Sequence, residues 1–403
     1  MKHKNKKIIY LDNASATKID PEVLKTILKS LKEDFYNASA IHEGGIFVNQ
    51  KIKDSRKKIA NSLSVSSEEI IFTSGATESN NLAILGTLYN FKDNFSKPHI
   101  ISTKIEHASV LELLIHLEKE NQIELTLLDV NQEGDLNIKD LKKNLKENTV
   151  LVSVMYANNE IGTIFDIKEI AKTIRHFRKN KIKNNHFPYF HTDATQATNY
   201  LSMNVLNLGV DLMSFNSAKI YGPKGIGVLY KKRNVEIKSL FYGGDQEFGL
   251  RAGTLNAPLI LGLVKALEIT NKIKETEVIR LTKLRNQFYI KLQKVFSKYN
   301  LEIRLNGNLE NRLPNNLNIS IPKIPSDLFL VELSMRGIYL SEKSACKTGE
   351  KKSSHVLDAL YQNQSLKNQS LRFSLGRETK KEDLDFVILS IDEILKKLKS
   401  WYL

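Results

Sequence analysis

The sequence predicts an α/β protein with a mostly parallel sheet, doubly wound by helices. Two observations carry this prediction. Short apolar runs bounded by polar turns alternate with stretches of helical spacing, which is the pattern of strands joined by helical crossovers. The chain of 403 residues, 41% of them hydrophobic, can also bury a large core. The runs that we interpret as strands are 68–74, 99–103, 149–157, 187–193, 211–217 and 225–230.

Helical elements follow from spacing and from capping residues. Helical periodicity is clear at 82–91 and 110–120. Asp20 before Pro21 is typical of a helix start, with the proline at the first helical position. Thr379 and Glu382 have the spacing of a capping box before an amphipathic C-terminal segment.

The C-terminal third predicts a second, smaller domain. A long, charged and helically periodic stretch at 263–293 leads into it. Strand-like runs at 317–321 and 371–376 flank a helix-like run at 326–337. We expect a large α/β domain over residues 15–265 and a smaller α+β domain formed by residues 1–14 and 266–403.

Composition excludes several classes of protein. The net charge is +15, but the basic residues are spread along the chain, so we expect no direct nucleic-acid binding. No apolar stretch approaches the ~18–20 residues that a membrane span needs. The apolar residues 8–11 are followed at once by Asp12, so the core of a signal peptide is missing and a cytoplasmic location is expected. The single cysteine, Cys346, excludes an internal disulfide.

Two charged residues follow strand-like runs, where open α/β sheets bind their ligands. Asp193 ends the run 187–193, and Lys219 lies two residues after the run 211–217. A lysine at the edge of a core loses solvation, so its amine is more readily neutral and nucleophilic. An acid can keep a pyridine nitrogen protonated, so the two residues together predict pyridoxal phosphate. Residues 73–81 (TSGATESNN) open a helix and would supply the phosphate site, because helix N-termini favour anions.

Nine motifs follow one another along the chain. They are YLDNASAT (10–17), FTSGATESNN (72–81), EHASV (106–110), ANNEIG (157–162), HTDATQ (191–196), KIYGPKGIG (219–227), LRAGT (250–254), SAC (344–346) and RFSLGR (372–377). In this order they resemble the motif series of the cysteine desulfurases, a branch of the pyridoxal-phosphate enzymes of fold type I. The resemblance runs from about residue 10 to residue 377 and implies a mostly parallel seven-stranded sheet flanked by helices, and a homodimer.

The resemblance implies roles around the cofactor ring. Lys219 would bind pyridoxal 5'-phosphate covalently, and Asp193 would pair with the pyridine nitrogen. Gln196 would bond the ring hydroxyl, and Asn159 would contact the ring or the substrate. His107 would stack on the ring and move protons, a role that suits an imidazole.

The resemblance also implies phosphate and substrate contacts. Arg372 and Asn37 would bind the carboxylate of L-cysteine, since the planar guanidinium suits a carboxylate. The residues expected to hold the phosphate are Ala76, Thr77, Asn216 and, from the partner subunit, Thr254. No metal site is expected.

Cys346 is the predicted nucleophile. It lies in a polar, lysine-rich stretch with few apolar neighbours to bury it, and nearby cations lower the pKa of a thiol. The resemblance implies that it takes the sulfur of cysteine as a persulfide, releasing L-alanine. The sulfur would then pass to an acceptor protein, such as an iron–sulfur scaffold or a tRNA-thiolation enzyme.

Several positions depart from the family pattern. Asn216 and Ala218 stand where the family usually has serine and histidine before the cofactor lysine. Asp245, Phe248 and Lys343 replace a glycine, an arginine and a glycine. These changes affect the phosphate contacts and the mouth of the predicted site, so cofactor affinity and partner choice are the properties that we expect to differ.

Two alternatives stay open at the level of the sequence. One is another class-V enzyme, a selenocysteine lyase or an aminotransferase, which would not need Cys346 for turnover of cysteine. The other is a basic binding module that has kept the fold without the chemistry. It would lack a bound cofactor and would bind nucleic acid with a steep salt dependence.

Overall fold

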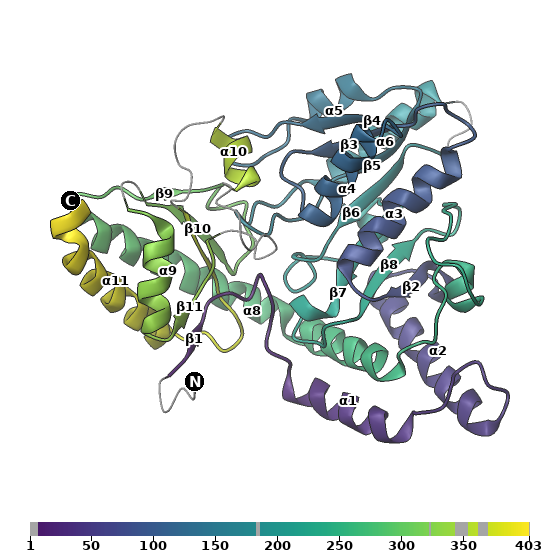
Figure 1. Cartoon of the computed structure of the whole chain (residues 1–403), viewed down its shortest axis with the longest axis horizontal. Coiled ribbons are helices and arrows are strands. Elements are labelled where there is room, and N and C mark those ends of the chain that lie inside the picture. The colour runs from purple at the N-terminus through teal and green to yellow at the C-terminus, as the bar shows by residue number, and fades with distance from the viewer. Residues whose placement is uncertain (1–6, 183–185, 322–323, 343–353, 362–369, 403) are drawn as a thin grey trace.

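The computed structural model of the chain describes residues 7–182, 186–321, 324–342, 354–361 and 370–402. Its main feature is one large sheet of seven strands in the order β2-β8-β7-β6-β5-β3-β4 (Figure 1). Only β8 runs antiparallel to its neighbours in this sheet, so the predicted fold class is confirmed. The strands are β2 (Ile70–Thr73), β3 (His99–Thr103), β4 (Glu124–Leu128), β5 (Thr149–Ser153), β6 (Tyr189–Asp193), β7 (Leu212–Asn216) and β8 (Gly227–Lys231).

The large sheet is buried on both faces. In β2, β3, β5 and β6 every residue is buried, which explains their continuous apolar runs. Successive side chains point to opposite faces, so Leu151 packs in one hydrophobic core and Val152 in the other. The sequence analysis did not identify β4. This strand lies at the edge of the sheet, and only Leu128 of its five residues is buried.

Helices alternate with the strands of the large sheet from β2 to β7, since α3, α4, α5, α6 and α7 each lie between two of these strands along the chain (Figure 1). The predicted start of the first helix is confirmed, because the Asp20 side chain accepts from the Glu22 amide at 2.9 Å and Pro21 opens the helix. The helices are α1 (Pro21–Glu33), α2 (Glu43–Leu63), α3 (Ala76–Phe91), α4 (Ala108–Lys119), α5 (Ile138–Asn144), α6 (Ile167–Lys181) and α7 (Val205–Leu208).

A second hydrophobic body contains the C-terminal part of the chain together with Ile9 and Leu11 from its beginning. Its three-stranded antiparallel sheet has the order β12-β10-β9, and β1 pairs in parallel with β11. The elements are β1 (Ile9–Tyr10), β9 (Arg304–Leu305), β10 (Asn316–Ser320), α9 (Ser326–Met335), β11 (Ile338–Tyr339), β12 (Ser370–Ser374) and α11 (Lys381–Tyr402). The short helix α10 (His355–Tyr361) also lies in the C-terminal part of the chain, but its buried side chains pack in the core beside the large sheet.

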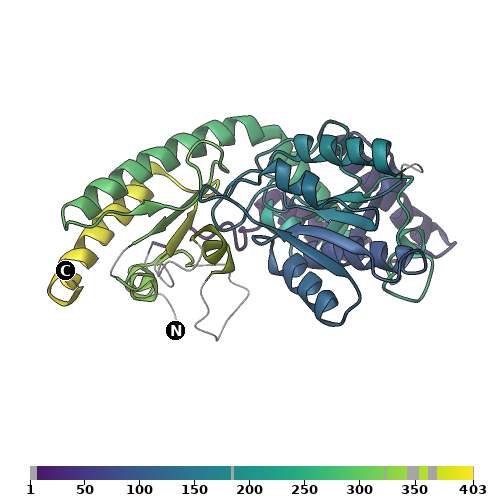
Figure 2. The ribbon, with the colours of Figure 1, turned by 90° about the horizontal axis from the view of Figure 1, so that it is seen from above.

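One long helix, α8 (Ala257–Ser297), joins the two bodies (Figure 2). Its first turns pack in the core beside the large sheet, and Leu281 to Phe296 pack in the second core. The domain boundary that we predicted at residue 265 falls inside this helix and stays a prediction. No helix within the described ranges is long and apolar enough to cross a membrane.

The last helix begins one residue later than the predicted capping box requires. The Thr379 hydroxyl accepts from the Gly376 amide at 2.9 Å. Asp383, rather than Glu382, accepts from the amide of Lys380 at 2.9 Å, and α11 begins at Lys381. Asp383 therefore supplies the contact at the helix start that the spacing assigned to Glu382.

Candidate active site

A cavity of about 210 Å³ opens where β6, β7 and the first turn of α3 meet. Open parallel sheets bind ligands at the carboxyl ends of their strands. The residues that we predicted from the sequence lie together at this end of the sheet. Nine residues named from the sequence line the cavity: Ala76, Thr77, His107, Asn159, Asp193, Gln196, Asn216, Lys219 and Arg372.

Lys219 reaches the cavity because the chain turns sharply after β7. A single 3₁₀ turn, Ser217–Lys219, follows the strand, and the chain then reverses into β8. The Lys219 ammonium donates to the backbone carbonyl of Ser15. An amine that would otherwise be solvated is thus held at the rim of a buried sheet, as the sequence predicts.

Asp193 is the last residue of β6 and is buried. Its Oδ2 accepts from the Asn80 amide group at 2.8 Å, and its Oδ1 accepts from the Thr195 amide at 2.9 Å. These two hydrogen bonds fix the orientation of the Asp193 carboxylate at the cavity wall. Two residues earlier on the same strand, burial lowers the pKa of His191 to about 4, so the imidazole ring of His191 is neutral.

His107 caps the N-terminus of α4. Its Nδ1 accepts from the Ser109 amide at 3.1 Å and lies 2.8 Å from the Ser109 hydroxyl oxygen. In the neutral ring the proton then sits on Nε2, by the logic of the hydrogen bonds around it. Gln196 is also held, because its Nε2 donates to the carbonyl of Ala14 at 2.9 Å.

The start of α3 has the features of an anion site. Gly75 precedes the helix, and no side chain caps it. A Cβ at Gly75 would meet nothing within 4 Å, so the space before the first turn is open. At Gly227 on β8 a Cβ would lie 2.6 Å from the carbonyl carbon of Gly75, so a side chain there would push this turn away. Ala76 and Thr77 follow and line the cavity.

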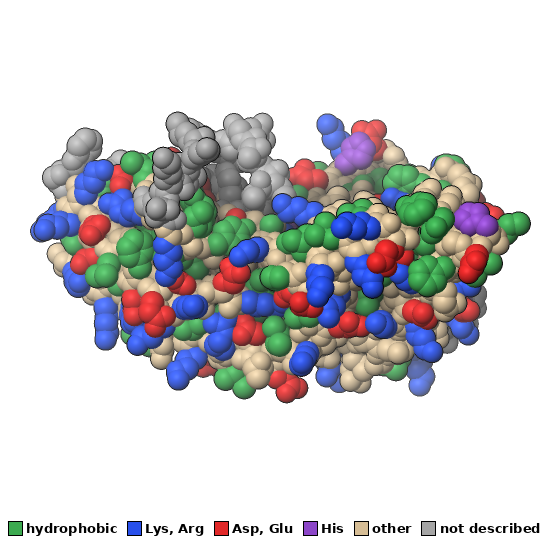
Figure 3. Space-filling model, turned by 90° about the horizontal axis from the view of Figure 1, so that it is seen from below, with side chains coloured by type: hydrophobic (Ala, Val, Ile, Leu, Met, Phe, Trp, Pro, Cys, Tyr) green, Lys and Arg blue, Asp and Glu red, His purple; other side chains and the backbone are tan. Residues whose placement is uncertain are grey.

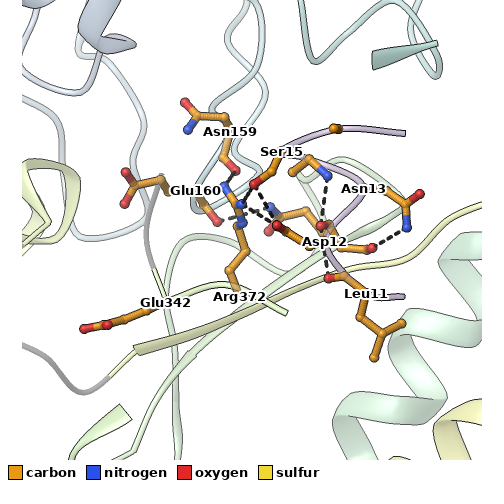
Figure 4. A network of polar contacts seen from close by, with 12 residues as sticks. Leu11, Asp12, Asn13, Ser15, Asn159, Glu160, Glu342 and Arg372 are labelled. Atoms are coloured by element: carbon orange, nitrogen blue, oxygen red, sulfur yellow. Dashed lines mark hydrogen bonds and ion pairs between the residues drawn. The ribbon is translucent and has the colours of Figure 1, made fainter. Parts of the chain in front are cut away.

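Arg372 lies on β12 and is almost fully buried, and its guanidinium joins three segments that are distant in sequence (Figure 4). Nη1 donates to the carbonyl of Asn159 at 3.0 Å. Nη2 donates to Asp12 at 2.8 Å and to the Ser15 hydroxyl at 2.7 Å. Nε is buried and makes no hydrogen bond within the described residues.

The remaining predicted residues lie elsewhere. Asn37 is exposed, its side chain accepts from the Ser39 amide, and it does not line the cavity. Thr254 is exposed and also lies outside the lining, and its expected role belongs to a partner subunit. Cys346, like Lys343, falls outside the described residues. The roles of these residues stay predictions.

Sequence reasoning assigned no role to three residues that shape the site. Ser15 and Asp12 hold Arg372, and Asn80 holds Asp193. All three lie in motifs that carried the family resemblance, 10–17 and 72–81. The signal was therefore present, but the contacts depend on chain segments that only the fold brings together.

Comparison with known proteins gives one consistent answer. The family model for class-V aminotransferases matches residues 9–387. The cysteine desulfurase IscS of Dictyoglomus turgidum is 41% identical over 395 residues, which cover 98% of this chain and 96% of that protein. The chain belongs to the cysteine desulfurase family.

Solved structures agree with membership of this family. A NifS-like protein is 33% identical with a TM-score of 0.88, and the match covers 97% of this chain and all of that one. A structure described as SspA in complex with cysteine is 31% identical with a TM-score of 0.75, over 91% of this chain and 98% of that one. The cysteine desulfurase IscS of Clostridium botulinum strain Hall is 38% identical over 97% of this chain and 95% of its own length.

Cysteine desulfurases are pyridoxal-phosphate-dependent enzymes, and the cavity fits this cofactor. The uncapped start of α3 suits the phosphate, and Asp193 offers a fixed carboxylate for the pyridine nitrogen. The side-chain oxygen of Asn216 is buried in the cavity wall without a hydrogen-bond partner in the described structure, as expected for a polar group beside a ligand. These features occur around one lysine, Lys219.

Proposed function

We propose that the enzyme takes the sulfur of L-cysteine onto Cys346, forming a persulfide and L-alanine, and then passes the sulfur to an acceptor protein. The bonds balance without a further reactant: the carbon–sulfur bond of the substrate breaks, a sulfur–sulfur bond forms on Cys346, and the thiol proton ends on the methyl group of alanine. One observation carries the proposal. Lys219, Asp193, His107 and Arg372 converge on one cavity in a member of this family.

Each residue has a task that its position supports. Pyridoxal phosphate, when bound, withdraws electrons from the α-carbon of an amino acid. Asp193 would keep the pyridine nitrogen charged, and Ala76 and Thr77 would hold the phosphate. Arg372 would orient the substrate carboxylate, and His107 would carry a proton at Nε2.

Partners and compartment follow from the same proposal. We propose a homodimer in which Thr254 reaches the partner's phosphate site, and an acceptor such as an iron–sulfur scaffold or a tRNA-thiolation enzyme. On the face shown in Figure 3, lysines and arginines are interspersed with acidic side chains, which favours protein partners over direct nucleic-acid binding. The cytoplasm is the compartment that we predict.

An assay of both products tests the function. Purified protein is supplied with cysteine, with and without added pyridoxal phosphate, and alanine and sulfide are counted with a thiol reductant present. We expect equal amounts of the two products, and we expect Cys346→Ala to lower both by about a hundredfold or more, because a nucleophile is lost. A keto acid as the product would indicate an aminotransferase. Turnover of cysteine by Cys346→Ala at the parent rate would refute the role of Cys346.

A further inference from the structure

Asn80 links the two sides of the candidate site, although it does not line the cavity. It lies on α3 and is fully buried. Its amide nitrogen donates to Asp193 Oδ2 at 2.8 Å and to the Ser109 hydroxyl oxygen at 2.9 Å. One amide group thus bridges a carboxylate at the end of β6 and a serine at the start of α4.

The direction of these bonds is fixed by chemistry. The opposite amide orientation would place Asn80 Oδ1 against the Asp193 carboxylate, where two acceptors repel. Oδ1 itself is buried without a hydrogen-bond partner among the described residues. Burying an acceptor without a partner costs folding free energy. The favourable contacts of this side chain are therefore the two hydrogen bonds that its amide nitrogen donates.

The Ser109 hydroxyl connects Asn80 to the imidazole ring of His107. Because Ser109 Oγ accepts from Asn80, its own hydrogen is available to His107 Nδ1, 2.8 Å away. The Ser109 amide donates to the same nitrogen at 3.1 Å. Two donors on Nδ1 favour the neutral ring with its proton on Nε2.

At the other end of the link each oxygen of the Asp193 carboxylate accepts one hydrogen bond. Asn80 holds Oδ2, and the Thr195 amide holds Oδ1 at 2.9 Å. Without Asn80 one oxygen would lose its donor, and the carboxyl group could rotate. Hydrogen bonds to the charged form of a carboxylate are among the stronger ones in proteins.

We propose that Asn80 is a positioning residue that orients the Asp193 carboxylate and sets the tautomer of His107 at the same time. The inference rests on the proposed function for its consequence: the acid that faces the pyridine nitrogen and the imidazole that moves protons are placed by a single side chain. It also predicts that cofactor binding and the His107 tautomer respond together to substitution at position 80.

Two variants separate the two proposed roles of Asn80, which are to orient Asp193 and to set the tautomer of His107. Asn80→Leu removes both donors at similar volume, and Ser109→Ala removes only the hydroxyl donor to His107. Asn90→Ala is the matched control, because Asn90 lies on the same helix, α3, and does not line the cavity. Asn80→Ala removes the same donors without a bulky side chain and repeats the test if Asn80→Leu does not fold.

Two readouts are independent of turnover. One is the affinity of the full-length, cofactor-stripped protein for pyridoxal phosphate, followed by absorbance. The other is the tautomer of His107 from nitrogen NMR of histidine-labelled full-length protein, with His107→Gln identifying the signals. We expect Asn80→Leu to weaken cofactor binding about tenfold to a hundredfold and to shift His107 toward a mixture of tautomers. Ser109→Ala should shift the tautomer of His107 alone, and Asn90→Ala should change neither readout.

The inference is overturned if Asn80→Leu or Asn80→Ala leaves both readouts at the parent values. It is also overturned if Ser109→Ala weakens the cofactor as much as Asn80→Leu does, because a general loosening of the site would do this. If the parent protein makes no alanine from cysteine while both readouts respond as expected, the proposed function fails and the role of Asn80 stands.

Discussion

At the scale of single residues, Glu106 is a buried acid directly before His107. Its Oε1 accepts from the Thr103 hydroxyl at 2.9 Å and from the Met155 amide at 2.9 Å. Oε2 has no hydrogen-bond partner among the described residues. Burial raises the pKa of Glu106 to about 8, and the nearby Asp193 carboxylate adds to the rise. The side chain is therefore mostly protonated at neutral pH.

This pKa gives folding stability a predictable pH dependence. The folded state binds the Glu106 proton up to about pH 8, whereas the unfolded chain releases it near pH 4.5. The stability of the parent protein therefore falls as pH rises between these values. Glu106→Gln removes the proton exchange and can keep both bonds to Oε1.

We expect Glu106→Gln to become more stable relative to the parent as pH rises from 5 to 8.5, by a total on the order of a few kcal/mol. Urea unfolding of both proteins across this range measures the difference. The exposed Glu236→Gln serves as a control and should show no such trend. A difference that is constant with pH would show that Glu106 is ionised in the folded protein.

At the scale of elements, the segment around the 3₁₀ turn Gln246–Gly249 is held by a buried ion pair. Glu247 and Phe248 both have left-handed backbone conformations, with φ of 52° and 58°. Phe248 stands where the family tends to have arginine. The Glu247 carboxylate accepts two bonds from Arg56 of α2, at 2.5 and 2.8 Å, and one from the Phe72 amide of β2 at 2.6 Å. These contacts fasten an otherwise exposed segment to the large sheet.

Glu247→Gln should therefore be strongly destabilising. Breaking a buried pair leaves the Arg56 guanidinium without its anion, at a cost of about 3–5 kcal/mol. Chemical denaturation measures the loss. Glu236→Gln makes the same change on an exposed part of the neighbouring segment and should cost less than about 0.5 kcal/mol. Equal effects of the two substitutions would contradict the importance of the pair.

At the scale of the whole molecule, α1, the segment after it and the start of α2 expose a run of large apolar side chains. Leu28 is 50% exposed, and Ile41 is 94% exposed. The other members of this apolar surface are Leu24, Leu31, Phe35, Ile46 and Phe47. Exposed apolar side chains grouped in this way are typical of an interaction site, and the proposed occupant is a second copy of the chain.

Sedimentation of the purified protein tests the homodimer. We expect a mass about twice the 45.9 kDa of the chain at micromolar concentration. Leu28→Asp combined with Ile41→Asp should weaken the dimer at least tenfold, because charges would be buried at the contact. Leu389→Asp, on the exposed side of α11, should leave it unchanged. A parent protein that sediments as a monomer would contradict the proposal.

Most of the large sheet and much of the candidate site could be predicted from the sequence, for a physical reason. Each buried strand is a short apolar run with a polar residue where it ends, so Asp193 and Lys219 could be placed at the same edge from the chain alone. The edge strand β4 was not predicted, because it is only partly buried and lacks a continuous apolar run. The ion pair Asp12–Arg372 was not predicted either, because no local pattern links two residues on segments that only folding brings together.

The N-terminal strand has a consequence for synthesis. The Leu11 amide donates to the carbonyl of Tyr339 at 2.7 Å, and the Leu11 carbonyl accepts from the Ser374 amide at 2.7 Å. In a nascent chain residues 9–15 are synthesised long before their partners at positions 339 and 374. This segment must therefore wait unpaired until those residues have left the ribosome, and the contacts of Asp12 and Ser15 with Arg372 can form only then.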